Sequence, residues 1–118
     1  MNTVKLKSYW TVIMRHQGEI EAVWLEDKII RAYINFTSDK RIGVWHISLY
    51  LALLYRWHEN EYVNPIQITR REIMKLAHVG SNVTYHKLIK QLQEFEYIKY
   101  LPSYHPTLGS QVYLGKIC

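Results

Sequence analysis

Apolar and polar residues recur with helical spacing over most of the chain and alternate like strands in three short segments. Residues 19–36 and 44–58 have helical spacing. The second of these is apolar almost all round, so we expect it to be buried centrally. Residues 66–68 alternate like a very short strand. Residues 1–17 alternate partly like a strand but fit a frayed helix nearly as well, so the pattern leaves them open.

The segment 19–36 carries apolar side chains on two faces of the expected helix. One stripe consists of Ile20, Val23, Ile30 and Ile34, and the other of Ala22, Leu25, Ile29, Tyr33 and Phe36. Two apolar faces need two surfaces to pack against. Either both faces are satisfied within the chain, or one of them packs on a second subunit, and the spacing favours neither reading.

Two short helices joined by a turn are indicated after residue 68. Thr69, with Glu72 three positions later, predicts a capping box at the start of a helix over 70–78. Gly80 would supply the conformational freedom for the turn, and Ser81 would cap the second helix. That helix is expected over 82–96, and the inward-facing residues of the first are expected to be Ile73, Leu76 and Ala77.

The last part of the chain reads as a hairpin. Residues 97–101 and 110–114 resemble strands, and the loop 102–109 between them holds two prolines and a glycine. The order helix, short strand, helix, turn, helix, strand, loop, strand is that of a winged helix-turn-helix domain. We therefore predict an α+β, mainly α fold with three helices and a small three-stranded antiparallel sheet in residues 41–118. Residues 1–40 would form an N-terminal helical extension and possible dimerisation element.

Charge is unevenly distributed along the chain. The protein has 15 lysines and arginines against 10 acidic residues, a net charge of +5. Residues 69–118 hold seven basic and three acidic side chains, so +4 of the excess belongs to the half with the two short helices. A basic surface favours polyanions, although a solvated lysine-rich surface has the same composition.

A helical projection of 82–96 separates a packing face from an outer face. The packing face consists of Tyr85, Leu88, Ile89, Leu92 and Phe95, whereas Val83, Lys87, Lys90 and Glu94 lie opposite. A valine beside two lysines suits a DNA groove, because its methyl groups can contact thymine while Asn82 pairs with adenine. Base-proximal roles are therefore expected for Ser81, Asn82, Val83 and Lys87, and phosphate contacts for Arg70, Arg71, His86 and Lys90. Thr84 is a further backbone-contacting candidate, and Ser103, Tyr104, His105 and Thr107 form the expected tip of the wing.

Several stretches resemble a known group of proteins. "SNVTYHKLIKQLQEFEYI" and "YLPSYHPTLGSQVYL" resemble winged-helix proteins carried by mobile and conjugative elements of Bacteroides-type bacteria. These are described as transcriptional regulators or as helix-turn-helix modules of replication proteins. "HISLYLALLYRWHEN" and "NPIQITRREIMKLA" look like the preceding parts of the same family, so the resemblance covers about Trp45 to Leu114. The third helix is also similar to the recognition helices of many bacterial winged-helix repressors. Those often carry Arg at the place of Asn82, so base preference does not transfer.

Other classes of function have little support in the sequence. The six histidines are scattered with no His-x3-His pair on one helix, and the single Cys118 excludes a cysteine-rich zinc site, so we expect no metal and no cofactor. The absence of a phosphate loop, nucleophile elbow or paired carboxylates argues against an enzyme. Neither an apolar run of membrane-spanning length nor a signal peptide is recognisable, so we expect a cytoplasmic protein.

Together these patterns predict a sequence-specific regulator of transcription that binds double-stranded DNA, with helix 82–96 in the major groove and wing 102–109 on the backbone or minor groove. We expect a homodimer. One alternative is a replication-initiation or excision accessory factor of a mobile element. The other is a protein-interaction winged helix that does not bind DNA. The target sequence and any small-molecule effector are not indicated by the sequence.

Overall fold

The computed structural model describes residues 17–103 and 109–114. Within them the chain forms four helices and a three-stranded antiparallel sheet, which confirms the predicted α+β, mainly helical fold. Residues 1–16, with the strand-or-helix alternative, lie outside the described part. The elements are α2 (Gln17–Ser38), α3 (Val44–Glu59), β1 (Ile66–Ile68), α4 (Arg70–Ala77), α5 (Asn82–Glu94), β2 (Ile98–Leu101) and β3 (Ser110–Leu114).

The sheet joins the distant strand β1 to the hairpin of β2 and β3. Its order is β1-β3-β2, so the last strand lies in the middle and pairs antiparallel with both others. Val112 of β3 is opposite Ile66 on one side and Tyr100 on the other. This topology and the order of the helices are consistent with a winged helix. Residues 104–108 of the expected wing lie outside the described residues.

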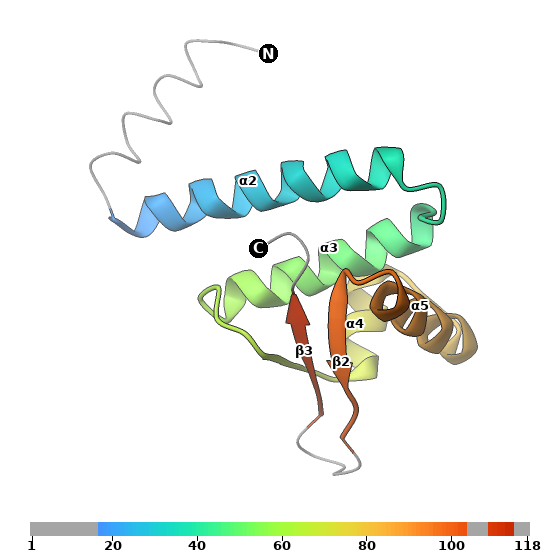
Figure 1. Cartoon of the computed structure of the whole chain (residues 1–118). Helices are drawn as coiled ribbons and strands as arrows, with labels where there is room; N and C mark the ends of the chain where they lie inside the picture. The colour runs from blue at the N-terminus through green and yellow to red at the C-terminus, as the bar shows by residue number, and fades with distance from the viewer. Residues whose placement is uncertain (1–16, 104–108, 115–118) are drawn as a thin grey trace.

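Helix α3 is the centre of the packing, as its all-round apolar sequence predicted. Leu49 and Leu53 are completely buried, because the helix lies between α2 and the remaining elements (Figure 1). Phe36 of α2 is buried, and its ring contacts those of Tyr50 and Tyr97, with centroids 5.5 and 5.3 Å apart. Helix α2 is therefore attached to the rest of the fold through an aromatic cluster.

The two faces of α2 have different environments. Ile29 is partly buried and Phe36 buried, so these members of the second stripe pack on the core. Tyr33 of the same stripe is 60% exposed. Ile30 and Ile34 of the first stripe are 57% and 59% exposed, so no described part of the chain covers them.

Three helices end in the same way, with a residue in left-handed conformation. After α3, α4 and α5 this residue is Glu61 (φ 56°), His78 (φ 57°) and Glu96 (φ 68°). In each case the next residue donates its N–H to a carbonyl five positions back, as Val79 does to Met74 over 2.9 Å. This is the Schellman ending, which normally uses glycine. None of the three positions is a glycine here.

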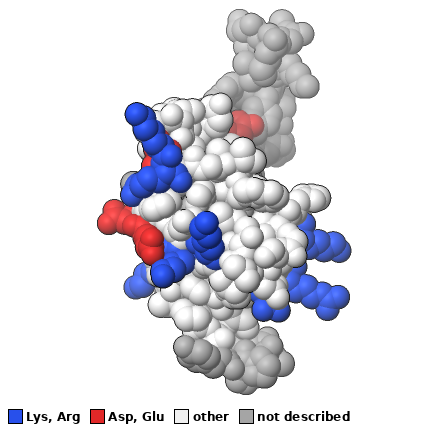
Figure 2. All heavy atoms as spheres, turned by 90° about the vertical axis from the view of Figure 1, so that its right-hand side faces the viewer, with Lys and Arg blue, Asp and Glu red and all other residues white. Residues whose placement is uncertain are grey.

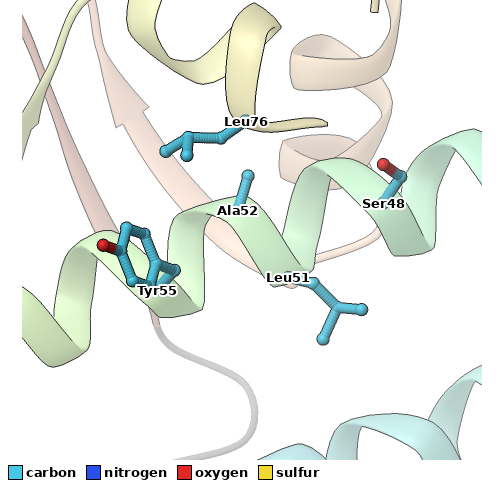
Figure 3. Close-up of a pocket in the computed structure, with 5 residues that line it drawn as sticks. All are labelled: Ser48, Leu51, Ala52, Tyr55 and Leu76. Carbon is cyan, nitrogen blue, oxygen red and sulfur yellow. The ribbon is translucent and has the colours of Figure 1, made fainter. Parts of the chain in front are cut away.

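Two local predictions are wrong. The positive φ angle in the turn before α5 belongs to His78 and not to Gly80, because the Schellman bonds at the end of α4 require it there. Leu76, predicted to face inward, is 39% exposed. It lies over Ala52 and Tyr55 of α3 and lines a shallow pocket of about 310 Å³ (Figure 3). Ile73 and Ala77 are buried as predicted.

Candidate nucleic-acid interface

Helix α4 presents two arginines at its exposed first turn. Thr69 caps the helix, since its side-chain oxygen accepts the N–H of Glu72 at 3.2 Å. The expected return bond from the Glu72 side chain is replaced by an ion pair with Arg56 of α3, in which Nε and Oε1 are 2.9 Å apart. Arg70 and Arg71 follow the cap and are both exposed. The ion pair fixes the start of α4 against α3 and leaves the two guanidinium groups to solvent.

The turn between α4 and α5 is anchored by one buried residue and ends in a cap. Val79 is buried, while Gly80 and Ser81 are exposed. The Ser81 hydroxyl accepts the N–H of Thr84 at 3.3 Å, which confirms Ser81 as the N-cap of α5. The first turn of α5 therefore begins at the surface, with N–H groups available to an anion.

Helix α5 separates its two faces as the projection predicted. Tyr85, Leu88, Ile89 and Leu92 are buried and Phe95 is partly buried. The outer candidates are Asn82, Val83, His86, Lys87 and Lys90, and all of them are exposed. Val83 is 79% exposed, the highest value among the exposed large apolar side chains of the described residues. Five of the residues that were predicted to contact DNA therefore lie on one accessible strip of α5.

The arginines of α4 and the strip on α5 are both exposed and come from consecutive helices. Burial raises the pKa of Tyr85 on the inner face of α5, and the positive charge of Arg70 acts in the opposite direction. Figure 2 shows lysines and arginines on both sides of the face that it presents, with fewer acidic side chains, most of them on one side. An excess of basic over acidic side chains favours contact with a polyanion.

The expected wing contacts are only partly described. Ser103 is exposed just beyond β2, and its N–H donates to the Ser110 hydroxyl at 3.4 Å. The Tyr100 and Ser110 hydroxyls are 3.0 Å apart, which closes the base of the hairpin. In Figure 1 the two strands extend from the helical body on the side opposite α2. Tyr104, His105 and Thr107 lie outside the described residues.

One residue of this surface was not predicted from the sequence. Trp45, in the first turn of α3, is 53% exposed and lines a pocket of about 360 Å³ with Val79, Gly80, Ser81 and Thr84. Thr84 is half-buried there. An exposed tryptophan beside a helix N-terminus offers an indole N–H to a ligand. The sequence shows Trp45 at the start of the apolar helix, but its proximity to Ser81 depends on the fold.

The described residues hold neither a metal-binding cluster nor a membrane-spanning helix. Among residues 17–103 and 109–114, no three His, Cys, Asp or Glu side chains come together as a metal would require. None of the described helices is both long and apolar enough to cross a bilayer. No family model matches the chain, and no curated protein or solved structure is significantly similar to it.

Proposed function

We propose that the protein is a sequence-specific transcriptional regulator that binds double-stranded DNA with α5 in the major groove. The observation that carries this proposal is the exposed strip of Asn82, Val83, Lys87 and Lys90 on α5, together with the exposed arginines that open α4. A merely solvated helix face gains nothing from a valine that is 79% exposed, whereas a groove offers it thymine methyl groups.

Each group has a role that its chemistry suits. Lys87 and Lys90 project from the outer face of α5 and would neutralise phosphates or reach guanine. Arg70 and Arg71 would hold the backbone, because α4 is the helix that crosses the backbone in this motif. Asn82 lies in the first helical turn, from which side chains reach base edges.

The salt dependence of duplex binding tests the phosphate contacts. Lys90→Ala should weaken binding to all duplexes and reduce the slope of log K against log salt by about one. Lys28→Gln is the matched control, because Lys28 lies on α2 with its ammonium 5.0 Å from the Trp57 ring centroid. Equal slopes for wild type, the Lys90 variant and the control would contradict the proposed contact.

A second candidate function has an observation of its own. Leu51, Tyr55 and Leu76 are exposed around the pocket between α3 and α4, which suits a winged helix that binds another protein. Absence of salt-sensitive binding to any duplex in a random pool would favour that function. If duplexes are selected, the genomic position of the site separates a promoter regulator from a replication or excision factor of a mobile element.

A further inference from the structure

The outward face of α2 has the spacing of a helix that pairs with another helix. Ile30 and Ile34 lie two residues before Ala32 and Phe36, roughly 200° around the helix from the face that packs on α3. With Asp27 they form a 3-4 spacing, and the sequence continues it towards the N-terminus at Ile20 and Val23. Alternating steps of three and four residues are those of the a and d positions of a coiled coil.

Charges beside this seam complement those of an identical helix in parallel orientation. With Asp27 at position a and Ile30 at position d, Glu26 takes position g and Arg31 takes position e. In a parallel pair the g residue faces the following e residue of the partner, so Glu26 of each copy would face Arg31 of the other. Asp27 is already paired, because its Oδ2 lies 2.9 Å from Nε of Arg31.

The length and attachment of α2 also fit a second copy. Its 22 residues provide roughly 33 Å of helix, which is about three heptads. In proteins most of the stability of a helix comes from the packing of an apolar face. Here α2 packs on α3 through buried Ala32 and Phe36, whereas Ile30 and Ile34 stay exposed. Helix α3 lies between α2 and the remaining elements (Figure 1).

We infer that two copies of the chain associate in parallel through this α2 seam, defined by Ile20, Val23, Asp27, Ile30 and Ile34. This association does not depend on DNA binding, and it can be measured in the absence of DNA. If the seam forms, two α5 helices are carried in fixed relation by one dimer, as recognition of a two-fold symmetric site requires.

Light scattering of the full chain after size exclusion tests the association. Wild type should have twice the chain mass of 14.2 kDa. The double variant Ile30→Asn and Ile34→Asn should run as a monomer with self-association weakened at least about 100-fold, because two apolar side chains leave the interface. Val63→Asn is the matched control, since Val63 is 58% exposed in the connector after α3 and should leave the dimer intact.

A monomeric wild type at high protein concentration would overturn the inference, as would a double variant that remains dimeric. Both isoleucines are exposed in the single chain, so circular dichroism should show the same helix content in the variants. If the wild type is monomeric and the double variant is less stable, the seam is covered within the chain and the inference is wrong.

Charge reversal tests the parallel orientation. Glu26→Arg and Arg31→Glu alone should each weaken the dimer, because like charges then face each other. An equimolar mixture of the two variants should form heterodimers in preference to either homodimer, since both cross-pairs become opposite in charge. A statistical mixture would contradict the parallel pairing.

Discussion

Tyr97 and Asp39 are joined by a hydrogen bond across the fold, in which the tyrosine hydroxyl donates to Oδ2 of the aspartate at 2.8 Å. The same carboxylate also accepts hydrogen bonds from Nε and Nη2 of Arg41, each at 2.9 Å. Asp39 follows α2 and Tyr97 follows α5, so the bond ties the end of the extension helix to the segment after the candidate recognition helix. The Arg41 guanidinium also lies over the Phe95 ring, 4.3 Å from its centroid.

The bonds of the Asp39 carboxylate should make the stability of the fold depend on pH in the acidic range. The Arg41 guanidinium holds the pKa of Asp39 well below its ordinary value of 3.8, and the Tyr97 hydroxyl adds to this effect. A folded-state pKa below the unfolded one stabilises the fold above about pH 4, and this contribution is lost as the pH falls further. Asp39→Asn should therefore unfold more easily than wild type at pH 6. The difference should shrink between pH 4 and pH 2 in urea titrations.

Tyr97 should make the stability of the fold depend on pH in the alkaline range. Burial, together with the bond to Asp39, raises the pKa of Tyr97 from 10.0 to about 12. Because the neutral form is favoured in the folded state, its stabilising effect is complete below pH 10 and is lost as the pH rises towards 12. Tyr97→Phe should reduce the free energy of unfolding at pH 7 by about 1–2 kcal/mol. An unchanged stability would show that the bond contributes nothing.

The non-glycine Schellman endings predict a stabilising substitution. A non-glycine residue in left-handed conformation costs roughly 1–2 kcal/mol, so Glu96→Gly should raise the free energy of unfolding by about 1 kcal/mol. Glu94→Gly is the matched control, because Glu94 lies within α5 and should lose about 1 kcal/mol instead. Thermal denaturation of both variants measures the difference, and changes of equal sign would contradict the assignment.

Two glycines should respond oppositely to alanine. Gly109 has φ +70°, and an added Cβ would lie 2.5 Å from the Ile68 carbonyl oxygen. Gly109→Ala should therefore destabilise the fold by at least about 1–3 kcal/mol, because the strained backbone and the clash act together. Nothing lies within 4 Å of a Cβ at Gly80, so Gly80→Ala should be neutral or slightly stabilising. Similar losses in the two variants would contradict this account.

Periodicity was sufficient to predict the packing side of α5, because Tyr85, Leu88, Ile89 and Leu92 recur on one face. It could not predict the turn, since a sequence shows which residue tolerates a positive φ angle but not which carbonyl groups the end of α4 must satisfy. The hydrogen bond between Tyr97 and Asp39 could not be predicted from the sequence either. It joins residues 58 positions apart, and only the packing of α2 on α3 brings them together.

Periodicity predicted only part of the candidate site. Exposure of Val83 and Lys87 follows from their position opposite the apolar stripe, and the structure confirms it. The approach of Trp45 to Ser81 required the tertiary arrangement, because the two residues lie on different elements. Local spacing therefore predicts which face is available, and the fold decides what that face presents.

The last prediction separates reading of bases from attraction to phosphates. Asn82 and Lys90 are both exposed on α5, but Asn82 lies in the first turn and Lys90 two turns further on. Asn82→Ala should relax the preference at one or two base pairs by about 1–3 kcal/mol in discrimination and leave the salt slope unchanged. Lys90→Ala should do the reverse. Selection of duplexes from a random pool with each variant measures both effects, and an unaltered consensus with Asn82→Ala would show that this side chain does not read a base.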